Sequence, residues 1–282
     1  MAADGSAEAA GSVVPKARQV AIGVDVGGTG IKVAAVDLAT GELASERLRV
    51  LTPKPSSPDM VIPVIARLVK RAANSAGDPT APVGVGMPCV ILDGVTMTAA
   101  NIDKKWVEYP ARDHMSRAVG RPVALGNDAD VAGLAELRYG VGATDPNARK
   151  GVVLFLTLGT GVGSALFNDG ILVPNTELGH MEIRGRDAEW RSAASARVRR
   201  QESWKGWSED LDEHLKAMDR ILWPRMFILG GGVSKQGERF IPRLTCRPPV
   251  FAATLRNEAG IVGAALLAID PTARKQEDPD AV

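Results

Sequence analysis

The sequence predicts an α/β fold of two similar lobes with a cleft between them, because one structural plan occurs twice along the chain. In each half an apolar run ends in a turn rich in Gly and Thr, and a second apolar run begins at once. The first turn is DVGGTGIK, Asp25 to Lys32, and the second is TLGTGVGSA, Thr157 to Ala165. Helices and further strands are expected after each turn. A duplicated plan of this kind predicts two lobes.

In the first half, residues 20–26, 31–37 and 43–50 are expected to form three strands. A helix should follow, because Ser57 is a good N-cap, Pro58 suits the first helical position, and apolar residues recur with helical spacing as far as Ala72. A strand at 83–87, a polar stretch, a strand at 122–125 and a helix ending near Tyr139 complete this half.

The second half opens with residues 140–149, whose Gly, Pro, Asn and Asp predict a linker. Strands at 152–156 and 162–167 flank the second turn. A helix over about 207–222 leads to a strand at 225–229 and the glycine run GGGVS, Gly230 to Ser234. We therefore divide the chain into a lobe over 19–127, a lobe over 128–256 and a closing helix over 257–270 that completes the first lobe. Residues 1–18 and 271–282 are expected to be flexible tails.

Composition narrows the class of protein. The 282 residues are 45% hydrophobic, which is enough for the cores of two ordinary domains. A formal net charge of +1 argues against a nucleic-acid partner. Two distant cysteines exclude a disulfide scaffold, and no apolar stretch approaches the roughly 18 residues of a membrane span. The N-terminus has no secretory signal pattern, so we expect a cytoplasmic protein with no membrane partner.

Each glycine turn predicts an anion-binding nest, because Gly permits positive φ angles and a close approach of the backbone to its ligand. Neither turn fits the common phosphate loop or the dinucleotide fingerprint. A plain β-hairpin connection is the alternative for either turn alone. Two such turns, each with a Thr, favour a phosphate chain held from two sides, and hence a phosphotransferase.

Phosphoryl transfer to an alcohol requires phosphate anchors, a divalent cation and a base. Asp25, just before GGTG, is the candidate for holding Mg²⁺ through water, although it could simply cap the turn. Asp128, in GNDAD at the end of a strand, is the candidate base. The alternative is that Asn127 or Asp128 serves as the N-cap of the next helix, with Asp130 an ordinary acid of its first turn.

A third cluster, ELGHME, contains Glu177 and His180, which could bind the vicinal hydroxyls of a sugar. A lone histidine is more often structural, so this signal is weaker. No cysteine lies near His180 and no G-x-S-x-G elbow occurs, so we expect neither a zinc site nor a serine hydrolase.

The motifs DVGGTGIK, GNDAD, LGTGVGSALFNDGILVPNTELGH and ILGGGVS, in this order, resemble the ROK family of repressors, open reading frames and sugar kinases. That family belongs to the actin-like, hexokinase-like ATPase superfamily. The resemblance covers about residues 19–269. The stretches ANIDKKW and LRNEAGIVGAA resemble those of its polyphosphate glucokinases and polyphosphate/ATP glucomannokinases. The resemblance implies two actin-like (ribonuclease H-like) lobes with an interdomain cleft, in a homodimer.

The resemblance further implies a glucokinase that uses Mg²⁺ to transfer a phosphoryl group from inorganic polyphosphate or ATP to the 6-hydroxyl of glucose. An ATP-only kinase of glucose, mannose or an amino sugar is the first alternative, and a non-catalytic sugar-binding regulator the second. The chain lacks the cysteine-rich zinc motif that many ROK proteins carry after the position of His180. Only about 18 residues precede the strand that leads to the first turn, so a helix-turn-helix repressor is not expected.

Site residues follow from the same resemblance. Asp128 would be the general base, and the sugar ligands would be Asn101, Asn127, Asp128, Glu177, His180 and Glu189. Phosphates or nucleotide would contact Asp25, Gly27, Gly28, Thr29, Lys32, Thr160, Gly161, Gly231 and Gly232. A basic track for polyphosphate would include Lys104, Lys105, Arg197 and Arg200, for which a solvated charged face is the alternative.

Overall fold

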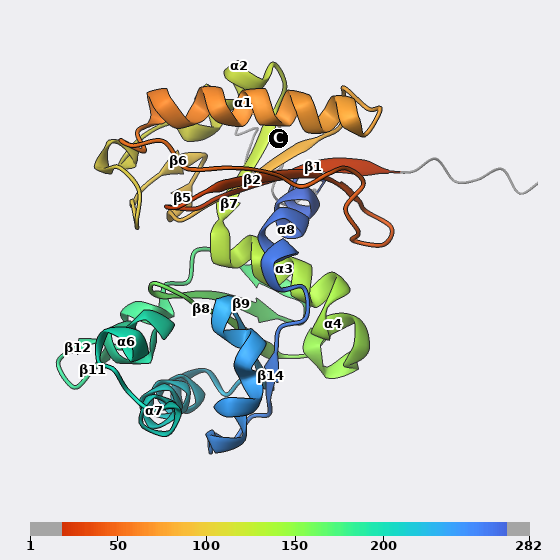
Figure 1. Ribbon diagram of the computed structural model, residues 1–282. Coiled ribbons are helices and arrows are strands. Elements are labelled where there is room, and N and C mark those ends of the chain that lie inside the picture. The colour runs from red at the N-terminus through yellow and green to blue at the C-terminus, as the bar shows by residue number, and fades with distance from the viewer. Residues whose placement is uncertain (1–18, 270–282) are drawn as a thin grey trace, which may run out of the picture.

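The computed structural model describes residues 19–269, which contain two five-stranded sheets with the same plan (Figure 1). The first sheet has the order β3 (Leu48–Val50), β2 (Ile31–Asp37), β1 (Val20–Val26), β4 (Val83–Met87) and β7 (Val123–Asn127). The second has the order β10 (Ile171–Val173), β9 (Val162–Asn168), β8 (Val152–Leu158), β13 (Met226–Gly230) and β14 (Val250–Ala252). In both, the first two pairings are antiparallel and the last two parallel. The predicted two-lobed α/β fold is confirmed.

The glycine turns occupy equivalent places in the two sheets. The first joins β1 to β2, which pair without interruption from Val20↔Asp37 to Val26↔Ile31. The second joins β8 to β9, which pair from Val152↔Asn168 to Leu158↔Val162. These strands are apolar on both faces because helices or loops cover both sides of each sheet.

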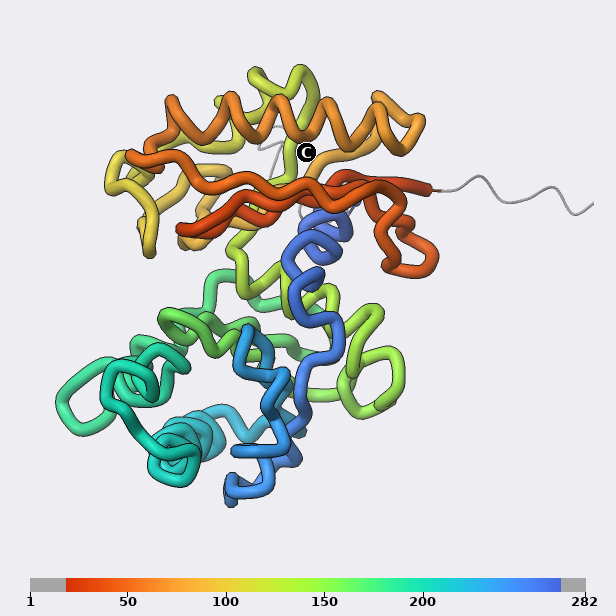
Figure 2. Tube along the Cα trace, viewed as in Figure 1, coloured from red at the N-terminus to blue at the C-terminus, as the bar shows by residue number. Residues whose placement is uncertain are grey.

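Helices α1 (Pro58–Ser75) and α2 (Ala111–Val119) cover one face of the first sheet, and α8 (Ala259–Leu267) lies on the other (Figure 1). The chain thus returns from the second sheet to pack α8 against the first, as the tube in Figure 2 shows. Glycine in the strands makes this close packing possible. A Cβ added to Gly23 would lie 1.8 Å from the carbonyl oxygen of Ile261, and one on Gly84 would lie 1.8 Å from that of Ala264.

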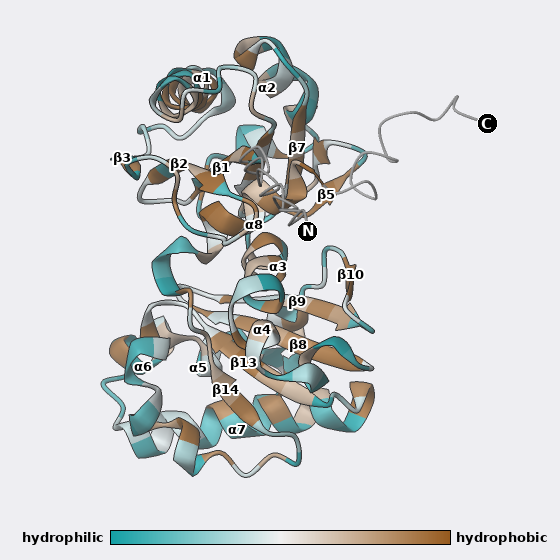
Figure 3. Cartoon of the chain, turned by 90° about the vertical axis from the view of Figure 1, so that its right-hand side faces the viewer, coloured by the Kyte–Doolittle hydropathy of each residue, from teal (hydrophilic) through white to brown (hydrophobic). Residues whose placement is uncertain are grey.

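The second sheet is covered by α7 (Trp204–Leu222) on one face and by α3 (Asp128–Tyr139) on the other (Figures 1 and 3). Figure 3 shows hydrophobic residues concentrated in the strands of both sheets. The shorter strands and helices are β5 (Ile91–Leu92), β6 (Val95–Thr96), β11 (Glu182–Ile183), β12 (Arg186–Asp187), α4 (Val141–Thr144), α5 (Glu189–Ser192) and α6 (Ala194–Arg199). The 3₁₀ turns are Lys104–Trp106, Pro146–Arg149, Leu178–His180, Gly232–Arg239, Ile241–Arg243 and Arg256–Glu258.

Several expected elements differ from the structure. Of residues 43–50 only Leu48–Val50 is a strand, with an isolated bridge from Leu43 to Val36. The expected linker at 140–149 holds α4 and a 3₁₀ turn, because the buried Glu136 carboxylate accepts the Val141 N–H at 3.4 Å. Helix α7 begins three residues early, since the Ser203 hydroxyl caps it by accepting from the Gly206 N–H.

The expected flexible tails, 1–18 and 271–282, lie outside the described residues, and the division of the chain at 127/128 and 256/257 stays a prediction. Across residues 19–269, no helix combines the length and apolar character needed to span a bilayer.

Candidate active site

A cleft of about 1090 Å³ is lined by both glycine turns and by the ends of elements from both lobes. It brings together most of the site residues predicted from the sequence. Those that line it are Gly27, Gly28, Thr29, Asn101, Lys104, Asn127, Asp128, Thr160, Gly161, Glu177, His180 and Glu189. Residues separated by more than 150 positions in the chain therefore share one cavity.

The two turns present unused backbone donors to this cleft. Each is closed by one hydrogen bond, from the Gly27 N–H to the Gly30 carbonyl and from the Gly159 N–H to the Gly161 carbonyl, both 3.0 Å. Within residues 19–269 the N–H groups at positions 28, 29, 160 and 161 donate to no protein acceptor. Such converging donors suit an anion.

The turns require glycine for close packing and not for the positive φ angles that the sequence led us to expect. Among the described residues, no glycine of either turn has a positive φ. Close approach is what requires glycine here: a Cβ on Gly28 would lie 2.5 Å from the Asn101 carbonyl oxygen, and one on Gly161 would lie 2.5 Å from a Glu189 carboxylate oxygen.

Asp128 is the first residue of α3, directly after β7. The N-cap is Asn127, whose side-chain oxygen accepts the N–H groups of Ala129 at 2.8 Å and Asp130 at 3.3 Å. The Asp128 carboxylate is therefore not needed to cap the helix and can face the cleft. Burial and the negative charge of Asp25 raise the pKa of Asp128 to about 6.

The wall beside Asp128 is rich in polar groups that face one another. The Asn127 amide nitrogen lies 3.4 Å from Oε1 of Glu177, and Nε2 of His180 lies 3.8 Å from Oε2 of the same carboxylate. Glu189 accepts the Val162 N–H at 2.8 Å, which ties its carboxylate to the second glycine turn. Paired donors and acceptors of this kind match adjacent hydroxyls on a sugar ring.

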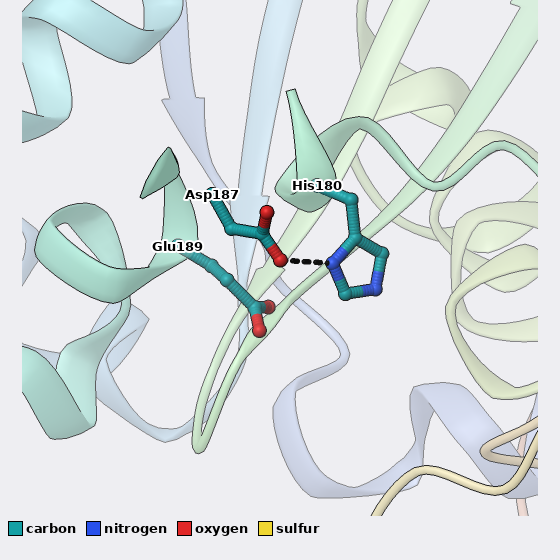
Figure 4. Close-up of side chains that lie close together, drawn as sticks. All are labelled: His180, Asp187 and Glu189. Carbon is teal, nitrogen blue, oxygen red and sulfur yellow. Dashed lines mark hydrogen bonds and ion pairs between the residues drawn. The ribbon is translucent and has the colours of Figure 1, made fainter. Parts of the chain in front are cut away.

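Asp187 contacts this wall through His180, although it lines the neighbouring hollow and not the cleft. Strands β11 and β12 form a hairpin that returns Asp187 to His180, so that its Oδ2 lies 2.8 Å from Nδ1 of the imidazole (Figure 4). No motif marks Asp187 in the sequence. The side chains of His180, Asp187 and Glu189 offer ligand atoms within 4.8 Å of one another, as a metal site would, but all three side chains already take part in the hydrogen bonds given above.

Asp130, on the buried side of α3, is a second residue whose environment could not be predicted from the sequence. Its side chain is 3% exposed, and its Oδ2 accepts the Asn175 N–H at 2.8 Å. Oδ1 has no hydrogen-bond partner in the described chain. Burial, with the nearby Glu177 and Asp128 carboxylates, raises the pKa of Asp130 to about 7. Asp130 is thus not the ordinary helix acid that the sequence suggested.

Four predicted phosphate residues lie outside the lining of the cleft. Asp25 and Lys32 face each other across the β1–β2 register, and their side chains form an ion pair of 2.7 Å. Gly231 has a φ of +83°, and a Cβ there would lie 2.4 Å from the Leu158 carbonyl oxygen, so the glycine run abuts the strand that leads to the second turn. Gly232 begins the 3₁₀ turn that follows.

The four residues expected to form a basic track are not brought together. Lys104 lines the cleft, whereas Lys105 lines a separate hollow between α1 and α2. The guanidinium carbon of Arg197 lies 4.0 Å from the ring centre of Trp204. Arg200 forms a 2.7 Å ion pair with Asp210 and is also paired with Glu202.

Comparison with known proteins agrees with this geometry. The ROK family model matches residues 21–196. A polyphosphate glucokinase of Mycobacterium tuberculosis is 44% identical over 251 residues, covering 89% of this chain and 91% of the relative. The crystal structure of inorganic polyphosphate/ATP-glucomannokinase from Arthrobacter sp. strain KM is 47% identical, with a TM-score of 0.82 over 88% of this chain and 98% of that one. A ROK glucokinase of Streptomyces griseus, solved with glucose and AMPPNP, is 26% identical with a TM-score of 0.75 over 88% of this chain and 98% of that one. The chain belongs to the ROK family.

Proposed function

We propose that this protein is a glucokinase that transfers the terminal phosphoryl group of inorganic polyphosphate to the 6-hydroxyl of glucose. The likeness to polyphosphate glucokinases over nine-tenths of the chain supports the donor and the acceptor. The observation that carries the chemistry is the placement of Asp128. Asn127 caps the helix instead of Asp128, and Asp128 lines a cleft that both glycine turns also line.

On the acceptor side, Asp128 accepts the proton of the 6-hydroxyl as that oxygen attacks phosphorus. With a pKa of about 6 this carboxyl is ionised at neutral pH and is still basic enough to take the proton. The remaining hydroxyls are held by Asn101, Asn127, Glu177, His180 and Glu189, all of which line the cleft. Fixing the ring in this way orients the attacking oxygen toward the donor.

On the donor side, the N–H groups of both turns bind the terminal phosphates and stabilise the charge of the transferring group. The Asp25 carboxylate is of the oxygen type that Mg²⁺ prefers, and it would hold the ion through water to neutralise the phosphates. Lys32, ion-paired with Asp25, adds a positive charge at the same place. Gly231 and Gly232 would border the base of ATP, the second donor.

We expect no zinc in the enzyme, a homodimer in solution, and a cytoplasmic location. Metal analysis, mass photometry and cell fractionation test these three points separately.

The acceptor is tested by incubating the purified protein with Mg²⁺, polyphosphate and one sugar at a time, with phosphorus NMR as the readout. Glucose should give a 6-phosphate while the polyphosphate shortens. If glucose gives no product while mannose or an amino sugar is phosphorylated, the alternative acceptor is supported. Binding of glucose without any product would support a sugar-binding regulator instead.

A further inference from the structure

Two arginines flank an exposed tryptophan beside the second glycine turn. The guanidinium carbons of Arg186 and Arg199 lie 4.7 and 5.3 Å from the ring centre of Trp190, which is 44% exposed. Arg199 also donates to the Trp190 carbonyl at 2.6 Å. The indole and its carbonyl thus hold both cations in place although they belong to different elements, β12 and α6.

These residues surround a hollow of about 370 Å³ that continues the cleft. Its lining consists of Thr160, Arg186, Asp187, Glu189, Trp190 and Arg199. Thr160 and Glu189 line the main cleft as well, so the two spaces share a boundary at the tip of the second turn. Thr160 therefore borders both the cleft and the hollow that the two arginines line.

The absence of an ion-pair partner distinguishes these two arginines from their neighbours. Within residues 19–269 neither Arg186 nor Arg199 forms an ion pair. Three arginines of the same segment do pair with carboxylates: Arg184 with Glu213, Arg191 with Asp210, and Arg200 with Asp210 and Glu202. Apart from the Arg199 N–H that bonds to the Trp190 carbonyl, the donors of Arg186 and Arg199 remain available to a ligand. Guanidinium groups match phosphate oxygens well.

The two carboxylates in the lining are already engaged on the side of the main cleft. Asp187 bonds to the His180 imidazole at 2.8 Å, and Glu189 accepts the Val162 N–H at 2.8 Å. Their charges are partly compensated there, whereas the guanidiniums face the hollow without a counterion. The hollow consequently has one wall formed by two guanidiniums without counterions. Its other wall holds two carboxylates that already accept hydrogen bonds.

We propose that this hollow, the Arg186–Arg199 subsite, binds phosphate groups of the polyphosphate chain that lie beyond the one transferred. The inference rests on the proposed function and adds the place where a long donor is recognised. A nucleoside triphosphate ends after three phosphates, whereas a long chain can continue past Thr160 to the arginines. The subsite therefore favours long donors over ATP, and salt weakens its effect.

The test combines binding and kinetics in the double variant Arg186→Gln/Arg199→Gln. Isothermal titration of long-chain polyphosphate, tripolyphosphate and ATP without sugar measures binding whether or not turnover occurs. We expect the Kd and the KM for long polyphosphate to rise about tenfold, and those for tripolyphosphate, ATP and glucose to change less than about twofold. Arg184→Gln, on the same hairpin but paired with Glu213, is the matched control and should leave all values unchanged.

Equal losses for long polyphosphate and ATP, a change confined to glucose, or an unaltered Kd for long polyphosphate would each overturn the subsite. So would a wild-type protein that does not bind long polyphosphate. Binding that depends on the two arginines, in a wild type that does not phosphorylate glucose, would support the subsite and contradict the proposed function.

Discussion

Nδ1 of His180 lies 2.8 Å from Oδ2 of Asp187, and this hydrogen bond fixes the orientation of the imidazole (Figure 4). With Nδ1–H donating to the Asp187 carboxylate, Nε2 faces the Glu177 carboxylate, and a protonated Nε2 is a donor toward it. The bond to Asp187 is also the largest cause of the raised pKa of His180. In the proposed function Asp187 would act on the sugar through His180, as a positioning residue.

Asp187→Asn should weaken glucose binding by about 3- to 30-fold in KM, with a smaller effect on kcat, because the imidazole loses its fixed orientation. It should also lower the pKa of His180. The chain has only three histidines, so proton NMR can follow each one after assignment with a His180→Gln sample. Glu182→Gln, on the partner strand of the same hairpin, is the control. A change in KM without a fall in the pKa of His180 would refute the positioning role.

Asp128→Asn should lower kcat by about 10²- to 10⁴-fold with either donor, since the amide cannot accept the hydroxyl proton. The variant keeps the Asn127 cap and so should retain the fold, which circular dichroism checks. Glucose binding, measured by titration calorimetry, should change little. Turnover close to that of the wild type would mean that another group is the base.

The pH dependence of turnover should reflect the ionisation of the Asp128 carboxyl. Because burial and Asp25 raise the pKa of Asp128 to about 6, the base is protonated and inactive below that pH. We expect kcat/KM for glucose, at saturating donor, to rise with pH and to level off above an apparent pKa of about 6. A rate that stays constant from pH 8 down to pH 5 would argue against this assignment.

The raised pKa of Asp130 predicts that removing its charge will stabilise the folded protein at high pH. Its pKa is about 7 in the folded protein and near 3.8 when unfolded, so the unfolded chain releases this proton more readily. The cost of the carboxylate to folding is absent below about pH 4, grows between pH 4 and 7, and is complete above pH 7. Asp130→Asn should therefore stabilise the protein by about 1–3 kcal/mol at pH 8, and the gain should vanish near pH 4. Urea unfolding at several pH values measures this, and a gain that does not depend on pH would contradict the account.

Glycine at position 263 lets α8 pack directly on α3. A Cβ there would lie 1.5 Å from the Val131 carbonyl oxygen, so Gly263→Ala should destabilise the protein by about 3 kcal/mol or more. Gly206→Ala, in the first turn of α7, would meet only the Ser203 hydroxyl at 3.6 Å and should stabilise by about 0.5–1 kcal/mol. Thermal unfolding of both variants gives the comparison. A neutral Gly263→Ala would show that the two helices can separate without cost.

The parts of the site that the sequence predicts are those in which a short local pattern determines the chemistry. Each glycine turn comes directly after its strand. Glu177 directly precedes the 3₁₀ turn that ends at His180, and both residues line one cleft. The choice between Asn127 and Asp128 as the N-cap could not be made from residue types, because both are good caps. It depends on how the chain enters α3 from β7.

The remaining features depend on residues that are distant in the sequence. Asp187 is recognised only once β11 and β12 pair, and Arg199 differs from Arg200 only because Asp210 and Glu202 are placed beside Arg200. The segment 140–149 resembled a linker by composition. Its order comes from Glu136, whose buried carboxylate bonds to the Val141 N–H and, more than a hundred positions later, to the Leu255 N–H at 2.7 Å.

The most direct test of the central claim is glucose 6-phosphate formation by the purified protein with Mg²⁺, comparing nucleotide-free polyphosphate with ATP. The likeness to polyphosphate glucokinases, together with a cleft that holds both glycine turns and Asp128, predicts turnover with polyphosphate in the complete absence of nucleotide. Activity with ATP alone would contradict the account and leave an ordinary ATP-dependent hexose kinase of the same family.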